Sequence, residues 1–202
     1  MPGTMSRADL RADLKDSLHD AASVLADPAD FDRCLAVAAE DLGRLMPRTL
    51  ASTLTLVAGQ AEYAAPADFL RFKMALWGAS TPVQPWDKCY PGRLPDVSDA
   101  AGLLILSPAP TAMQIALLGA SYRFFYFAGY AVADAAAQTT VPEHSRSLLL
   151  LRAQAEACRE LALRNVSKPV TMRDAVGSQP RNGTPSALYQ MLLAEFETRV
   201  GR

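Results

Sequence analysis

The sequence has few of the residues from which metal sites are usually built. It contains two histidines, His19 and His144, which stand in no HxH or HExxH relation to each other or to a cysteine. Its three cysteines, Cys34, Cys89 and Cys158, are far apart and form no CxxC pair. This spacing argues against a zinc site. We interpret the cysteines as reduced thiols, with Cys34 and Cys158 packed in a core.

Catalytic motifs are also missing. The chain has no GxSxG nucleophile turn, no GxxxxGKS or GxxxxGKT phosphate loop and no GxGxxG dinucleotide turn. The neighbouring acids Glu40 and Asp41 point in different directions on a helix, as on a solvated face. Lysine plus arginine (20) nearly balances aspartate plus glutamate (21), so no general DNA-binding charge excess exists. We therefore expect no enzyme, no catalytic residues, no cofactor and no metal.

Long apolar runs are absent too. The most apolar stretch begins at Leu103 and is broken by Ser107, Pro108 and Pro110, far short of the ~20 residues that a membrane helix needs. The first residues are charged and carry no apolar segment of the signal-peptide type. We expect a soluble, unexported protein with no membrane contact. The 202 residues, 50% of them hydrophobic, suit one domain with a substantial core.

Helical periodicity marks both ends of the sequence. Residues 6–26 repeat apolar side chains at steps of three and four, and Ser6 is the predicted N-cap. Asp27 is predicted to cap a second helix, which ends at Pro47. A third helix is predicted from a capping box at Thr140 to about residue 166. A last helix starts at Thr184, after a polar linker.

The helical period is lost between about residues 53 and 130. Alternating and aromatic runs predict four to six strands there, among them Phe69 to Trp77, Leu103 to Leu106 and Ile115 to Phe127. Residues 79–102 are rich in proline and predict a long loop, with a further strand considered at Val83 to Trp86.

This order of elements predicts an α+β fold: a helical bundle of about four helices with a β-strand insertion between the second and third helices. We expect one domain over 1–202. Its helices cover about 6–47 and 140–166, its β insertion about 53–130, and its linker and C-terminal helix 167–202.

An aromatic block follows in residues 122–127. Tyr122, Phe124 and Tyr126 fall on one face of the predicted strand, and Phe125 and Phe127 on the other. Such a block could stack nucleic-acid bases. Aromatic residues on both sides are more typical of a core or interface strand, and we favour that interpretation.

One segment is distinctive. Residues 57–71 contain Gly59, Gln60, Tyr63, Pro66, Asp68 and Phe69 in the spacing GQ-x-x-Y-x-x-P-x-D-F, and Pro108 and Pro110 follow in an L-x-P-x-P step. The set resembles the signature of head–tail connector adaptors of tailed bacteriophages, over roughly residues 27–166. Each residue has an architectural explanation as turn, strand end or corner. We interpret the set as a folding signature rather than a catalytic one.

The resemblance implies a structural virion protein of the phage neck, assembled in the host bacterial cytoplasm. It implies a ring, usually of twelve copies, between the portal and the tail. The partners implied are the portal protein, a tail or stopper (nozzle) protein, further copies of the chain, and packaged DNA that passes through the lumen during ejection without sequence recognition. The near-neutral net charge suits such a lumen, since a strongly basic one would hinder sliding.

The resemblance also places the segment that grips the portal at 167–202. Candidate portal contacts are Arg173, Arg181, Arg199 and Arg202, because arginine forms bidentate pairs at interfaces. The loop 79–102 offers Trp86, Tyr90 and Arg93 as candidates for contacts to the tail or to a neighbouring subunit.

Two alternatives stay open at this stage. One is another ring protein of the neck or tail: a stopper, a tail-tube protein or a terminator. The other is a small-molecule-binding α+β domain with a pocket between the aromatic strands and the third helix. The number of copies per ring distinguishes another ring protein from an adaptor. Stabilisation of the fold by an added small molecule would indicate a ligand-binding domain.

Overall fold

The computed structural model describes residues 4–78, 94–100, 102–165 and 184–201. The chain divides into two compact units, one of Met1–Met46 with Tyr130–Arg202 and the other of Pro47–Gly129. We call them the helical unit and the β unit. Strands between helical segments give an α+β fold, which confirms the expected fold class. That the two units act as one adaptor domain stays a prediction.

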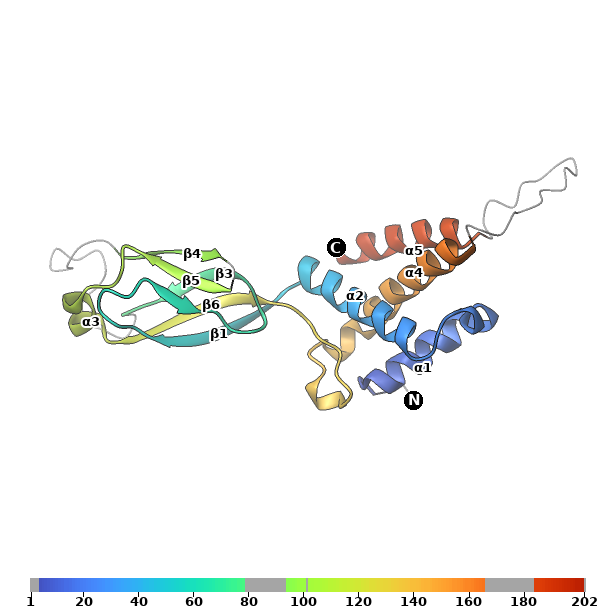
Figure 1. Ribbon diagram of the computed structural model, residues 1–202, viewed down its shortest axis with the longest axis horizontal. Helices are drawn as coiled ribbons and strands as arrows, with labels where there is room; N and C mark the ends of the chain where they lie inside the picture. The colour runs from blue at the N-terminus through green and yellow to red at the C-terminus, as the bar shows by residue number, and fades with distance from the viewer. Residues whose placement is uncertain (1–3, 79–93, 101, 166–183, 202) are drawn as a thin grey trace, which may run out of the picture. The chain divides into compact units, whose positions relative to one another are not determined.

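The helical unit is built around one central helix (Figure 1). Its elements are α1 (Arg7–Leu18), the 3-10 helix η1 (His19–Val24), α2 (Ala29–Leu45), the short 3-10 helices η2 (Ala136–Gln138) and η3 (Glu143–Ser145), α4 (Arg146–Asn165) and α5 (Pro185–Val200). Helix α4 packs against α1, α2 and α5. Ala153, Ala155 and Ala157 of α4 are fully buried, and such short side chains let neighbouring helices approach closely.

The core of this unit contains two of the three cysteines. Cys34 of α2 is buried among the leucines and phenylalanines of the helices, and Cys158 of α4 is also buried. Burial raises the pKa of the Cys34 thiol to about 12, and it also raises the pKa of Cys158. The expectation that both are core residues is confirmed. Cys89 lies outside the described residues.

A charged cluster lies inside the same unit. The guanidinium of Arg152, only 7% exposed, bonds to Asp41 of α2 at 2.7 Å and to Glu156 of its own helix at 3.2 Å. Both carboxylates are themselves more than four-fifths buried. The cluster joins α2 to α4. Because these charges are largely removed from water, each is stabilised mainly by its oppositely charged partners.

Two predicted caps are confirmed. The Ser6 hydroxyl accepts the N–H of Asp9 at 3.2 Å at the start of α1. The Thr184 hydroxyl accepts the N–H of Ala187 at 3.2 Å at the start of α5, with Pro185 in the first turn.

Two other predicted caps were wrong. Asp27 does not cap α2, since its carboxylate pairs with Lys15 at 2.9 Å and the helix begins at Ala29 without a side-chain cap. Thr140 does not open a helix, because its hydroxyl accepts the N–H of Ala131 at 2.7 Å and α4 begins only at Arg146. In both cases a residue distant in sequence bonds to the side chain expected to cap.

The first helix is shorter than predicted. Helix α1 ends at Leu18, where His19 adopts a φ of +50°, and the chain continues as the 3-10 helix η1. The apolar side chains Ala22 and Leu25 remain buried. Their spacing of three fits a 3-10 turn as well as an α-helix, so the pattern alone does not distinguish the two.

The described residues of the β unit form two antiparallel three-stranded sheets. The strands are β1 (Arg48–Thr55), β2 (Glu62–Ala64), β3 (Phe69–Leu76), β4 (Asp96–Ala100), β5 (Leu103–Ser107) and β6 (Ser121–Ala128). Sheet A has the order β1-β6-β3, and sheet B the order β2-β5-β4. Buried residues of both sheets form one hydrophobic cluster. The sheets therefore pack face to face as a small sandwich (Figure 1).

The inner face of sheet A is aromatic. Tyr122, Phe124 and Tyr126 of β6 are buried, with Tyr126 stacked on Phe69 at 5.6 Å between ring centroids and Trp77 edge-on to Tyr122 at 5.9 Å. The predicted division of the aromatic block into two faces is confirmed. The inner set is core, which agrees with the interpretation favoured from the sequence.

Two strand assignments need correction. Residues 115–118, predicted as the start of the strand Ile115 to Phe127, instead belong to helix α3 (Ala112–Leu118). Thr111 and Gln114 make a reciprocal capping box, with bonds of 3.2 and 2.8 Å, and Gly119, at φ +87°, ends the helix. A capping box and an apolar run together favour a helix, and the sequence reasoning overlooked the box.

The expected loop 79–102 also contains a strand. Its part Asp96–Ala100 is β4, which pairs with β5 along its whole length. The Asp99 carboxylate accepts the N–H of Phe72 at 3.1 Å, at the edge of sheet A. The prolines that predicted a loop all precede Asp96, and pairing with β5 outweighs the low strand propensity of the two aspartates. The considered strand Val83–Trp86 lies outside the described residues.

Candidate functional site

The first half of the signature builds a closed turn between β1 and β2. Gly59, at φ +79°, occupies a left-handed position that favours glycine. The Gln60 side chain donates to the carbonyl of Glu62 at 2.8 Å. The Tyr63 hydroxyl accepts the N–H of Val57 at 2.9 Å and lies 3.3 Å from the carbonyl of the same residue. Three signature residues therefore hold one turn.

The second half of the signature meets the first in space. The N–H of Gly59 donates to the carbonyl of Pro110 at 2.8 Å, and the N–H of Leu106 donates to the carbonyl of Ala61 at 2.9 Å. Pro108 follows the last residue of β5, and Pro110 is fully buried. Since proline lacks the N–H that a ladder requires, this step ends the strand and directs the chain into α3.

Asp68 connects the three strands of sheet A. One carboxylate oxygen accepts the Tyr126 hydroxyl of β6 at 2.9 Å, and the other accepts the Arg48 guanidinium of β1 at 3.0 Å. Arg48 also donates to the carbonyl of Gly129 at 2.9 Å. Burial raises the pKa of Tyr126, and the hydrogen bond to Asp68 raises it further. Pro66 accepts the N–H of Phe69 at 3.0 Å, which makes the corner before β3.

These contacts are of one kind. They close turns and join strands inside the β unit. Pro66 and Phe69 also line a surface depression beside Asp99 and Gly102, but they bring no polar side chain to it. A family model described as SU10 adaptor protein matches residues 5–179 of the chain. The chain belongs to the SU10 adaptor protein family. The resemblance to phage connector adaptors, stated from the signature, is confirmed at the level of the family.

Two solved structures are similar to this SU10 adaptor family member. One is the neck of a native GTA particle computed with C12 symmetry, with 16% identity, a TM-score of 0.30, and coverage of 90% of this chain and 86% of that one. The other is the neck of an empty GTA particle computed with C6 symmetry, with 15% identity, a TM-score of 0.27, and coverage of 83% and 79%. No curated protein matches.

The interface candidates named from the sequence are placed only in part. Arg199 lies in the last turn of α5 and pairs with Glu195, one turn earlier, at 2.5 Å. The other candidates, Trp86, Tyr90, Arg93, Arg173, Arg181 and Arg202, lie outside the described residues. Their roles at the portal or tail stay predictions.

An exposed face that sequence reasoning missed covers the outer side of sheet A. On β6, Arg123, Phe125 and Phe127 alternate with the buried aromatic residues. The register sets Arg71 beside Phe127 and Met74 beside Phe125. Arg71 lies over the Phe127 ring at 4.5 Å, and Arg123 over the Phe125 ring at 5.5 Å. The face is apolar at its centre and cationic around it. The alternation of buried and exposed residues in 121–128 indicates the part of this face that β6 contributes, but not the part that β3 contributes.

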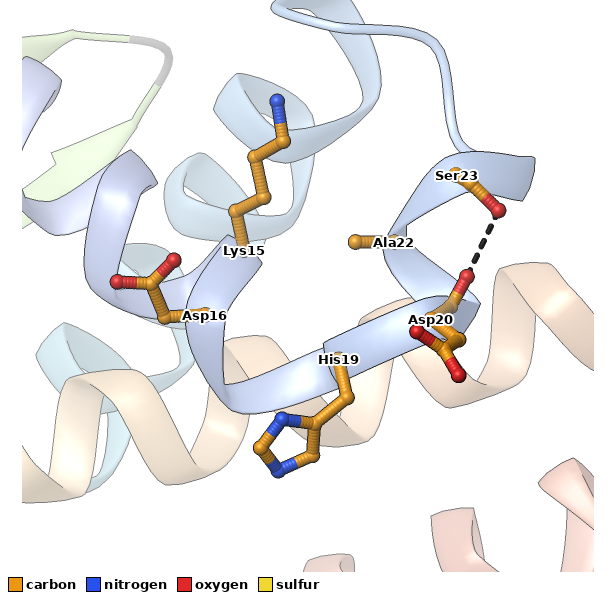
Figure 2. A pocket seen from close by; sticks show the side chains of 6 residues that line it. All are labelled: Lys15, Asp16, His19, Asp20, Ala22 and Ser23. Carbon is orange, nitrogen blue, oxygen red and sulfur yellow. Dashed lines mark hydrogen bonds between the residues drawn. The ribbon is translucent and has the colours of Figure 1, made fainter.

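The helical unit has a shallow depression at the α1–η1 junction, lined by Lys15, Asp16, His19, Asp20, Ala22 and Ser23. Figure 2 shows that these side chains point in different directions. Ser23 donates to the backbone carbonyl of Asp20 at 2.7 Å, and Lys15 pairs with Asp27. Polar groups that do not converge form no small-molecule site.

Within the described residues, no three His, Cys, Asp or Glu side chains come together to hold a metal ion. No helix in the part of the chain that the structure describes is long and apolar enough to cross a membrane.

Proposed function

We propose that this protein is a structural head-to-tail connector adaptor of a phage or phage-like particle. It forms a ring between the portal and the tail, around the channel through which DNA leaves. Membership of the SU10 adaptor family carries this proposal, because the match extends over residues 5–179 and so includes the β unit and most of the helical unit.

The contacts of the signature residues support a structural role. Gly59, Tyr63, Asp68 and Pro110 bond to backbone or to neighbouring strands of the β unit. Residues that act on a substrate would instead present unsatisfied polar groups to a cleft. A near-neutral chain also suits a channel wall, since strong positive charge would hold DNA by releasing counterions.

The partners follow from the same proposal. The portal protein binds the segment 167–202, with Arg173, Arg181, Arg199 and Arg202 as contacts. A tail or stopper protein, or the neighbouring subunit, binds the loop 79–102 with Trp86, Tyr90 and Arg93. Twelve copies surround the DNA, and the ring assembles in the bacterial cytoplasm as part of the virion.

Co-expression with the portal protein encoded in the same genome tests the proposal. The expected complex contains the portal ring and twelve adaptor copies by native mass spectrometry. The variant R173S/R181S should bind the portal at least about tenfold more weakly, the loss expected from a few rim charges. A matched control, K15S/R44S, removes two exposed cations of the helical unit and should bind normally.

Other stoichiometries would point elsewhere. Six copies per layer on a tail tube, without portal binding, would identify a tail-tube or terminator protein. Binding to a preformed portal–adaptor ring alone would identify a stopper. Either result would overturn the adaptor assignment.

A further inference from the structure

The β unit separates its charges between the two sheets. The strands of sheet A contain Arg48, Arg71, Lys73 and Arg123 and no acidic residue, while the strands of sheet B contain Glu62, Asp96 and Asp99 and no basic residue. Since the sheets pack face to face, their outer faces are on opposite sides of the sandwich. Arg48 and Asp99 lie on the inner faces, because they are paired with the buried Ala128 and Leu104. The outer face of sheet A therefore carries Arg71, Lys73 and Arg123, and the outer face of sheet B carries Glu62 and Asp96.

Three cations, Arg71, Lys73 and Arg123, are held on the outer face of sheet A. Arg71 and Lys73 both lie over the Phe127 ring, at 4.5 and 5.0 Å, and Lys73 also bonds to Thr49 at 3.2 Å. Cation–π contact restrains these long side chains before any partner binds, which lowers the entropy lost on docking. Met74, 46% exposed, and the two outer phenylalanines give the face an apolar centre.

The outer face of sheet B has the complementary pattern. Along β5, Leu103 and Ile105 point outward and alternate with Leu104 and Leu106, which are buried. Glu62 is paired directly with Ile105 across the β2–β5 ladder. Asp96 is paired with Ser107 on the same face, and the remaining neighbours are small: Ala64, Ser98 and Ala100. Leu103 and Ile105 therefore form an apolar stripe beside carboxylates. Because the neighbouring side chains are short, larger side chains of another surface can contact this stripe.

We propose that the cationic outer face of sheet A docks on the acidic outer face of sheet B of a second copy, so that β units join head to tail around the ring. This inference rests on the proposed ring function and says which surfaces build the ring. The two faces are different and lie on opposite sides of one unit. Their contact is therefore heterologous, the type that closes into a ring when each step adds a rotation.

The chemistry of the cationic face favours a protein over duplex DNA as its occupant. Aromatic residues, Met and Arg are enriched in the centres of protein interfaces, whereas contacts to DNA phosphates are made by charged and polar groups, which leaves the partly exposed Phe125 and Phe127 without a role. Symmetric pairing of two identical faces is disfavoured, because like charges would meet. A second copy supplies the opposite charge on a surface of matching apolar character.

Charge reversal on the full-length chain, assembled with its portal, tests the pairing. R71E/K73E makes both outer faces acidic, and E62K/D96K makes both basic. Each variant alone should need at least about a tenfold higher concentration to form complete rings, because like charges then meet at every junction. Mixing the two variants, or combining all four substitutions in one chain, should restore ring formation. The control K15E/R44E changes charge on the helical unit and should assemble as the wild type does.

Several results would overturn the pairing while leaving the adaptor function intact. One is normal assembly of R71E/K73E. Another is failure of the mixture and of the combined variant to recover, although circular dichroism shows that they are folded. A third is normal rings with lost binding to a duplex DNA probe or to a tail protein, which would assign the cationic face to that partner. If the wild-type chain forms no ring with its portal, the proposed function itself fails.

Discussion

Asp68 offers a direct test of whether the family signature acts through architecture. Its carboxylate accepts hydrogen bonds from the Tyr126 hydroxyl at 2.9 Å and from the Arg48 guanidinium at 3.0 Å. It therefore joins β6 and β1 to the corner before β3. We expect Asp68→Ala to destabilise the β unit without affecting the helical unit. The two lost bonds differ in cost, because they differ in burial.

The larger loss is at Tyr126. This residue is 5% exposed, and the substitution leaves its hydroxyl without an acceptor, which costs about 1–3 kcal/mol. Arg48 is 23% exposed and keeps its bond to Gly129, so losing its partly exposed pair costs only about 0.2–1 kcal/mol. The free energy of unfolding should therefore fall by about 1–4 kcal/mol. Asp68→Asn, which keeps an acceptor oxygen, should cost about half as much.

Tryptophan fluorescence can restrict the measurement to the β unit. The chain has two tryptophans, Trp77 and Trp86. In a W86F background the remaining reporter is Trp77, which is buried in the core of the β unit and donates to the Gly119 carbonyl at 2.8 Å. Urea unfolding followed by this signal yields the free energy, and an unchanged m-value shows that the same surface unfolds.

A double-mutant cycle separates the named bond from other effects. Asp68→Ala and Tyr126→Phe should not add, since each removes the same bond, and the coupling should be about 1–2 kcal/mol. Additivity within about 0.4 kcal/mol would show that the bond contributes nothing. A cost of Asp68→Ala below about 0.5 kcal/mol would refute the architectural interpretation of this signature residue.

Further predictions concern packing, buried charge and a buried thiol. Gly78→Ala should cost about 2–3 kcal/mol, since φ is +69° and the new Cβ would lie 2.6 Å from Leu118 Cδ2. Gly59→Ala, at φ +79° in open space, should cost only about 1 kcal/mol in the same fluorescence assay. If the two substitutions lower the free energy of unfolding equally, the contact with Leu118 does not explain the cost at Gly78. Arg152→Ala removes the buried cation between Asp41 and Glu156, which keep only their exposed partners Arg44 and Arg159. It should destabilise the helical unit by about 3 kcal/mol in thermal unfolding followed by circular dichroism, and a loss below about 1 kcal/mol contradicts this. Burial raises the pKa of the Cys34 thiol to about 12, so above about pH 8.5 the unfolded thiol ionises first and stability falls as pH rises. Cys34→Ala should flatten this decline between pH 9 and 11, and an unchanged slope would contradict it.

The helix starts show what local sequence can predict. Ser6 and Thr184 were identified correctly because each bonds to a backbone N–H three residues away, a contact that depends on the local chain alone. Asp27 and Thr140 have equally suitable side chains. Their partners, Lys15 and Ala131, come from other parts of the chain and are known only from the fold.

The signature illustrates the same limit in the β unit. Its turn at Gly59 and its corner at Pro66 follow from residue type, and both are present. The bond from Gly59 to Pro110 and the bond from Tyr126 to Asp68 each span more than fifty residues of sequence. No local rule predicts these bonds. They explain why residues so far apart belong to one signature.

The charged face of sheet A was beyond sequence reasoning for a specific geometric reason. Strict alternation from the inward Phe69 would have turned Arg71 and Lys73 toward the core. The pairing of β3 with β6 instead shifts register between Phe69 and Arg71 and again between Phe72 and Met74. Each irregularity adds a residue to β3 and changes which side chains face outward. Phe69 and Phe72 therefore both pack inward, and both cations reach the Phe127 ring on the outer face. The two bulges keep charge out of the core, and they also create the cationic surface on which the head-to-tail pairing of β units depends.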